Sequence, residues 1–272
     1  GNDEAARQAA LDDLAGYGAD FGAFLAGANP NIDPAAIEAN LAEHVATLTA
    51  VIDAQAAGDQ ETAYNELRMA YGHMQMTATV LADAIAMQFP EMFSGSAVTP
   101  AADLRAALNV LLSEHVYVAT LATNGREAEF LAAAGALDLN SQDLAAAIGS
   151  VYGEAAGAAF LELWRTHIGF FVNYTLGVAG NDEAAKQAAL DDLAGYGVDF
   201  GAFLAGANPN LTQEAIASLL APHVTPLTVV IDAQAEDAPE AYTLLRDAYG
   251  HMQMVADPLS EAIIQQFPDS FR

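Results

Sequence analysis

The sequence predicts an all-α protein built from antiparallel four-helix-bundle repeats, and its composition and periodicity lead to this fold. Hydrophobic residues make up 53% of the 272 residues, and much of that share is alanine, the best helix former. The chain has a single Trp and no long Val or Ile runs, which strands prefer. Apolar residues instead recur every three or four positions, as expected for amphipathic helices.

A long stretch of sequence occurs twice and sets the organisation of the chain. Residues 1–31 and 180–210 differ only at Arg7/Lys186 and Ala19/Val198, so 29 of these 31 positions are identical. The likeness continues more loosely to residue 90 in the first copy and residue 268 in the second. A different segment, residues 96–179, separates the copies. Such self-similarity is typical of repeat architectures.

Each copy is expected to contain three helices. In the first copy, an apolar stripe predicts a helix up to the loop at Asn29-Pro30, because proline cannot continue a helix. Asp33-Pro34 starts a second helix, and a third follows Gly58-Asp59 and ends at Phe89-Pro90.

The middle segment is expected to be helical as well. Thr99-Pro100 is a helix-start signal, and apolar residues from position 104 predict a helix to about residue 122. A shorter helix is expected over residues 127–137, and another begins after Asn140-Ser141 and is broken near Gly153. A last helix runs through Phe160 to Tyr174.

Short connections between long helices predict antiparallel neighbours, which is the arrangement of helix bundles. We interpret residues 96–272 as a complete four-helix-type bundle formed by the middle segment and one copy. Residues 1–95 then form a half-repeat, the second half of a bundle unit. Its apolar face would have to dock on the middle segment or on another chain.

The charge balance limits the partners of this protein. The sequence has 36 acidic and 8 basic residues, a formal net charge of −28, and no cysteine. Such a surface repels nucleic acid, and a thiolate metal site is impossible. No uninterrupted apolar run has the length of a membrane span, so membrane insertion is not expected.

Several stretches resemble a helical repeat of secreted bacterial proteins that is often labelled as similar to the N-terminal domain of copper amine oxidases. They are Leu112-Ser113-Glu114-His115-Val116, Leu163 to Phe171, Asp199 to Leu204 with Ala207 to Asn210, and the doubled Tyr-Gly-His-Met-Gln-Met at 71–76 and 249–254. The resemblance covers residues 96–272 and implies tandem repeats and an extracellular or cell-surface location. It implies no oxidase activity, because that chemistry belongs to a different, β-rich domain.

All the histidines fall on the apolar stripe of an expected helix. They are His44, His73, His115, His167, His223 and His251. A stripe covers roughly a third of a helix surface, so chance would rarely place every one of them there. In residues 96–272 each of four helices contributes one imidazole, and facing helices of a bundle can gather such groups into one site.

This pattern predicts a buried transition-metal site. Imidazole suits Cu, Zn and Ni, and a thioether three residues after His251, at Met254, favours copper. Met76 stands at the same spacing from His73, and His44 is the only other histidine of that copy. Met252 and Met74 are rotated by about 100° from these positions and are expected to pack elsewhere.

Three other interpretations stay open at this point. The histidines can be neutral core residues bonded to other groups, since buried polar atoms are normally hydrogen-bonded. They can also hold a haem or another cofactor. Without a metal site, the protein would be a structural or self-assembling surface module. We expect no enzymatic activity, because no nucleophile and base arrangement, di-iron spacing or phosphate loop is recognisable.

Overall fold

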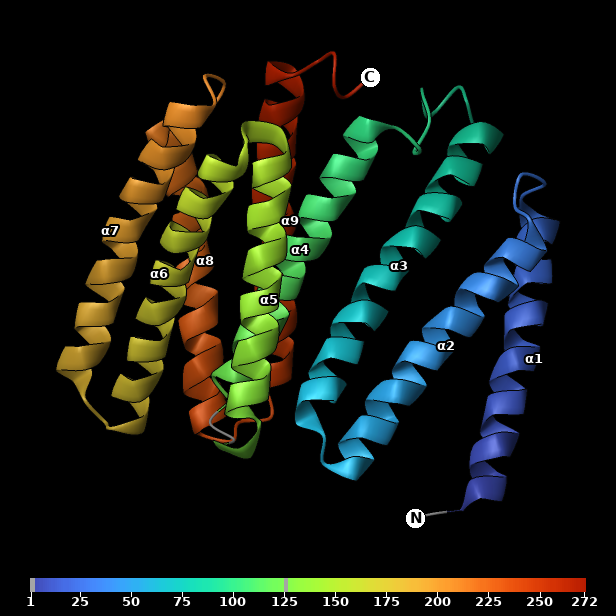
Figure 1. Cartoon of the computed structure of the whole chain (residues 1–272), viewed down its shortest axis with the longest axis horizontal. Coiled ribbons are helices and arrows are strands. Elements are labelled where there is room, and N and C mark those ends of the chain that lie inside the picture. The colour runs from blue at the N-terminus through green and yellow to red at the C-terminus, as the bar shows by residue number, and fades with distance from the viewer. Residues whose placement is uncertain (1–2, 125–126) are drawn as a thin grey trace. The chain divides into compact units, whose positions relative to one another are not determined.

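The computed structural model describes residues 3–124 and 127–272, and within them it contains nine helices and no strand. In chain order they are α1 (Glu4–Ala28), α2 (Pro34–Ala57), α3 (Gln60–Gln88), α4 (Pro100–Ala122), α5 (Glu127–Tyr152), α6 (Glu154–Ala179), α7 (Glu183–Ala207), α8 (Gln213–Ala235) and α9 (Ala241–Gln266) (Figure 1). The prediction of an all-α protein is confirmed.

The chain divides into two compact units, residues 1–103 and residues 104–272. The first unit holds α1, α2 and α3. The second unit holds α5 to α9 and all of α4 except its first turn. Among α1 to α3 of the first unit and among α5 to α9 of the second, successive helices lie beside one another and run in opposite directions (Figure 1).

The helix ends follow local chemistry. Asp3, Asp33, Asp59 and Asp182 precede helices, and the side chain of each accepts a hydrogen bond from a backbone N–H of the first turn. These bonds satisfy donors that the helix itself leaves unpaired. Acidic caps therefore account for part of the large acid excess.

The middle segment differs from the expectation at one point. Asn140-Ser141 does not separate two helices, because α5 runs without interruption through both residues. The Ser141 hydroxyl donates to the Leu137 carbonyl, and the Asn140 amide donates to the Leu111 carbonyl and to Glu114 Oε2. Both side chains are fully buried, so these contacts replace the turn-forming bonds that such residues make in loops. The expected break at Gly153 is present, where φ is +92°.

The two units differ in the size of their cores. The first unit has a small cluster of buried side chains, centred on Ile32, Ile37 and Ala84. The second unit has an extended core to which all of α4 to α9 contribute. Its centre is aromatic, with Trp164 stacked on Phe160 at 5.2 Å between ring centroids.

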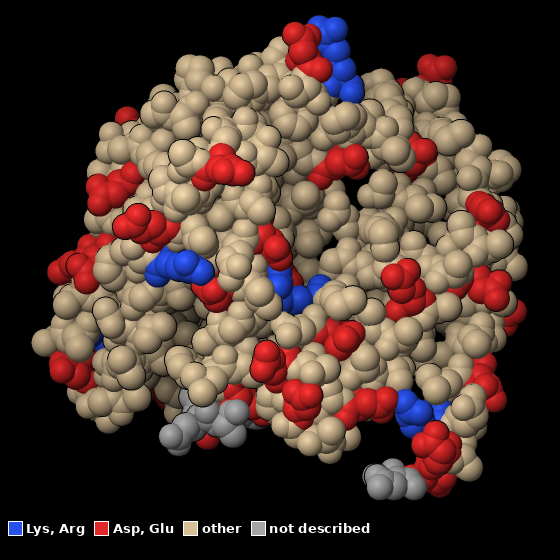
Figure 2. Space-filling view, viewed as in Figure 1, with Lys and Arg blue, Asp and Glu red and all other residues tan. Residues whose placement is uncertain are grey.

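Acidic side chains are scattered over the face shown in Figure 2, and few basic ones lie among them. One helix among the described residues, α8, is apolar and long enough to cross a membrane by length and composition, although it has no uninterrupted apolar run. Its His223, Leu227 and Val230 are buried in the core of the second unit. In this structure α8 packs as a core helix.

Candidate metal centre

Two histidines meet in the core of the second unit. His115 of α4 and His167 of α6 are 1% and 4% exposed, and their Nε2 atoms lie 3.3 Å apart. Each stands on the buried face of its helix, next to residues such as Val116 and Phe171. The two imidazoles can share one hydrogen bond, with one Nε2–H donating to the other Nε2.

Aromatic rings surround this pair. Trp164 lies 4.8 Å from His115 and 4.5 Å from His167, between ring centroids, and Tyr196 of α7 stacks on His167 at 4.9 Å. Trp164 is buried because it stands three residues before His167 on the same face of α6.

Burial keeps the histidines neutral. Loss of solvation lowers the pKa of His115 well below its usual value, and the nearby His167 and His223 lower it further. Desolvation, followed by the charge of His223, lowers the pKa of His167 to about 3. The Trp164 carbonyl opposes this shift, yet Nδ1 of His167 has no well-formed hydrogen bond. At neutral pH each ring is therefore neutral and has one unprotonated nitrogen.

His223 and His251 continue the series on α8 and α9. His223 is 7% exposed and meets Phe171 edge to face, with 6.4 Å between the ring centroids. Desolvation and then the charge of His251 lower the pKa of His223 to about 4. His251 is half-buried, with an unpartnered Nε2. His223 thus acts electrostatically on both His115 and His167, and His251 acts on His223, but only His115 and His167 touch.

The four imidazoles do not converge on one point in this conformation. Within residues 3–124 and 127–272, no group of three or more His, Asp or Glu side chains is assembled at metal-binding distances. The preassembled part of the expected site is therefore the pair formed by His115 and His167, and His223 is its nearest further imidazole donor.

The methionines lie differently from what the spacing suggests. Met254 is 57% exposed, and Met252 is 1% exposed and borders the core cavity described below. The residue of α9 that faces the core is thus Met252, because Met254 is turned toward solvent. In the first unit, Met76 and Met74 are 48% and 44% exposed. A thioether ligand at Met254 or Met76 has no support from these positions.

The first unit brings His44 and His73 together without further histidines. Their rings stack with 6.2 Å between centroids. Nε2 of His73 hydrogen-bonds to the Asn40 carbonyl at 2.7 Å, and Nδ1 lies 3.9 Å from Glu43. Burial, and then His73, lower the pKa of His44. Because Nε2 of His73 is already bonded to backbone, this pair fits a structural role better than a ligand role.

Sequence reasoning missed Trp164 and Tyr196, which enclose the pair. Tyr196 stands three residues after Leu193 and four before Phe200, so helical spacing could have placed it on the buried face of α7. The same spacing in α1 would have predicted burial of Tyr17, which is 57% exposed. Helical spacing therefore predicts burial of the tyrosine in both copies and cannot tell which of the two is buried.

No family model, no curated protein and no solved structure matches this chain.

Proposed function

We propose that the second unit is a non-enzymatic binding module for a transition-metal ion, held by His115 and His167 with His223 as a third ligand. The supporting observation is the 3.3 Å distance between the two Nε2 atoms. Two nitrogens bound about 2.0–2.1 Å from a tetrahedral ion lie roughly 3.3–3.4 Å apart. The spacing of the pair fits an edge of such a tetrahedron.

The protonation state of the pair also favours metal binding. Histidine binds a metal only as neutral imidazole, and burial already keeps both rings in that form. The surrounding rings exclude water, so an ion would exchange its solvent ligands for nitrogen. Copper is the first choice because it stands highest in the affinity order of nitrogen sites, and zinc and nickel follow.

Metal analysis combined with paired variants tests this proposal. The protein purified without added metal is analysed for Cu, Zn and Ni, and its melting temperature is measured with and without each ion. We expect one ion for each chain and a rise in melting temperature, because a ligand bound to the folded state stabilises it. His115→Phe and His167→Phe should abolish both effects.

His44 provides the matched control, because it occupies the repeat position of His223 but lies in the first unit. His223→Phe should weaken metal binding, and His44→Phe should leave it unchanged. Absence of any bound metal and of any change in melting temperature would overturn the proposal. An unchanged stoichiometry in His115→Phe and His167→Phe would overturn the assignment of the site.

A second candidate function is self-association through the first unit, and a comparison of identical residues favours it. Leu14 is 44% exposed and its counterpart Leu193 is 4% exposed, and Tyr17 is 57% exposed against 8% for Tyr196. In the second unit, these positions of α7 pack against the core that α4 to α6 help to form. In the first unit, the same apolar face is open to solvent.

We propose that this face docks on helices equivalent to α4–α6, supplied by a neighbouring repeat or another copy, so that the chain forms bundle repeats with one complete unit and one half. We also propose an extracellular or cell-surface location for either function, in line with the acidic composition and the sequence resemblance. With such docking, the protein would be one module in an array of repeats.

Light scattering coupled to gel filtration measures the oligomeric state. We expect species larger than the monomer at high concentration, and Leu14→Glu should shift the population to monomer. Leu176→Glu is the control, since Leu176 is 65% exposed but belongs to the second unit. A monomer at all concentrations, or equal effects of both variants, would contradict the self-association proposal.

A further inference from the structure

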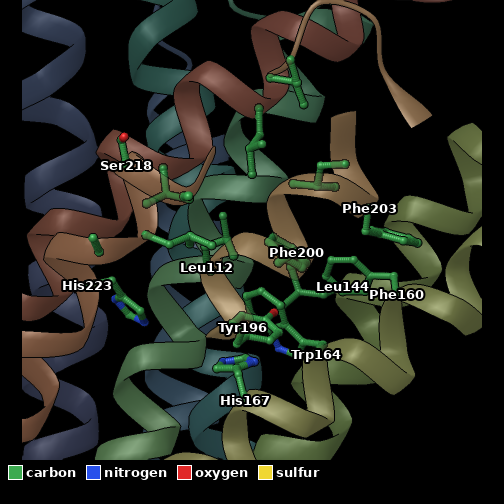
Figure 3. A pocket seen from close by; sticks show the side chains of 18 of the residues that line it. Leu112, Leu144, Phe160, Trp164, His167, Tyr196, Phe200, Phe203, Ser218 and His223 are labelled. Atoms are coloured by element: carbon green, nitrogen blue, oxygen red, sulfur yellow. The ribbon is translucent and has the colours of Figure 1, made fainter. Parts of the chain in front are cut away.

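The core of the second unit contains a cavity of about 550 Å³. This volume lies within the range of small-molecule sites, roughly 300–1,000 Å³. Its walls are mainly apolar and aromatic, with Leu112, Phe160, Phe200 and Phe203 among the residues that project toward the space in Figure 3. A void of this size is unusual, because protein interiors are normally close-packed.

A comparison of the two copies shows where the space comes from. α1 and α7 approach their partner helices equally closely at one end, since a Cβ added at Gly22 or at Gly201 would lie 2.5 Å from a backbone oxygen. One turn earlier the copies differ. A Cβ at Gly18 would touch Leu41 at 3.8 Å, whereas a Cβ at Gly197 would meet nothing within 4 Å. The line along which α7 and α8 pack against each other, called the seam below, is therefore open at Gly197.

Side-chain size at one repeat position contributes to this opening. Glu38 of α2 lies against Gly18, with its Cγ 4.0 Å from the added Cβ. The corresponding residue of α8 is Ala217, which lines the cavity. The second copy therefore lacks the long side chain that covers the seam in the first.

The entrance lies on the same side. Four residues of α8 line the cavity and are also exposed to solvent, at intervals of three or four positions. They are Glu214, Ser218, Ala221 and Thr225. Ala194 of α7 is exposed and lines the cavity as well. Most of these side chains are small, so a ligand can enter between α7 and α8.

The polar groups of the wall limit what the cavity can hold. Within the described part of the chain, the Trp164 Nε1–H and the Tyr196 hydroxyl are buried without a hydrogen-bond partner, and both residues line the cavity (Figure 3). The indole N–H is a donor only, and buried donors are normally paired. An occupant with an acceptor oxygen at this end would satisfy them.

The charge of the wall excludes an anionic occupant. Among the described residues, no Lys or Arg lines the cavity and Glu214 is its one charged residue, and the whole chain carries a net charge of −28. An anion would lose its hydration without gaining a partner. We propose that the cavity binds an uncharged, largely apolar molecule that carries a hydroxyl or carbonyl oxygen. This inference does not depend on a bound metal.

The single tryptophan of the chain makes the site directly observable. Trp164 is the only Trp, so its fluorescence reports on the cavity wall alone. The probe is a brominated long-chain fatty alcohol, whose bromine atoms quench tryptophan on contact. The experiment uses the full chain in the presence of a chelator, so that failure of the metal proposal does not affect the result. We expect saturable quenching.

Two variants should block the cavity. Gly197→Leu places a side chain in the open space, and Ala217→Glu restores the residue that covers the seam in the first copy. Each should weaken binding of the alcohol by at least about tenfold, which is about 1.4 kcal/mol, because the added side chain takes up space that the ligand would occupy. Gly195→Leu is the matched control: it lies on the exposed face of α7, and its added Cβ also meets nothing within 4 Å.

The expected pattern is quenching of the wild type and Gly195→Leu, with weak quenching of Gly197→Leu and Ala217→Glu. Thermal melts followed by circular dichroism verify that each variant is folded. No saturable quenching of the wild type, or equal affinity in the control and both blocking variants, would overturn the proposal. Equal or tighter binding of the corresponding brominated fatty acid, an anion at neutral pH, would overturn the assignment to uncharged ligands.

Discussion

His115, His167 and His223 are buried with their rings in the neutral form. A group whose pKa is lowered by folding adds stability above its unfolded pKa, near 6.5 for histidine, and this stability is lost as the pH falls toward the folded value. For His167 and His223 the folded values are about 3 and about 4. The stability is therefore lost from about pH 6.5 down to about pH 4 for His223 and down to about pH 3 for His167.

Metal-free protein should become less stable across this window. Between neutral pH and about pH 5, each of these histidines should lower the free energy of unfolding by about 2 kcal/mol, because only the unfolded chain takes up its proton. Chemical denaturation at the two pH values measures the loss.

His167→Phe replaces the imidazole by a ring that cannot be protonated, so the variant should lose about 2 kcal/mol less than the wild type on acidification. Carboxylates that titrate in the same window are common to both proteins and cancel in this comparison. The same pH dependence in both proteins would show that His167 is not buried as a neutral ring.

Helices α1 and α7 have nearly the same sequence but bury different fractions of their apolar residues. Leu193 is 4% exposed and packs in the core of the second unit, whereas Leu14 is 44% exposed. Helix propensity and capping are the same in both, since Asp3 and Asp182 make equivalent bonds. The difference in burial therefore comes from the neighbouring helices.

Leu193→Ala should be the more damaging of two identical substitutions. We expect a loss of about 2–5 kcal/mol for Leu193→Ala, because it leaves a cavity in a packed core, and less than about 1 kcal/mol for Leu14→Ala. Tryptophan fluorescence during denaturation measures the loss caused by Leu193→Ala. Far-ultraviolet ellipticity measures the loss caused by Leu14→Ala. Equal losses would mean that the Leu14 face is covered in solution.

The two units should also unfold separately. The cluster of buried residues around Ile32 and Ile37 is much smaller than the core of the second unit, and stability grows with the apolar area removed from water. The first unit is therefore the less stable of the two.

Denaturation followed by two probes should reveal this difference. Ellipticity reports all the helices, whereas fluorescence reports only the surroundings of Trp164 in the second unit. We expect an early loss of about a third of the ellipticity, in line with three of nine described helices, before the fluorescence changes. Coincident transitions would contradict independent units.

Local sequence was sufficient for the helices and many of their ends. Aspartate caps, Asn-Pro loops and the period of apolar residues act within a few positions, so they are visible without the fold. The placement of His115, His167 and His223 toward the core followed from the same period. Continuity of α5 through Asn140 did not, because the contacts of that side chain with Leu111 and Glu114 come from α4.

Only the tertiary structure decided what the repeated residues contact. Tyr17 and Tyr196 have the same neighbours in sequence, yet the first is exposed and the second stacks on His167. Met252 rather than Met254 faces the core, and the seam at Gly197 opens into a cavity. The physical reason is that burial depends on helices far away in the chain. The helical period shows which face of a helix is apolar. Packing against α4 to α6 determines in which of the two copies that face is buried.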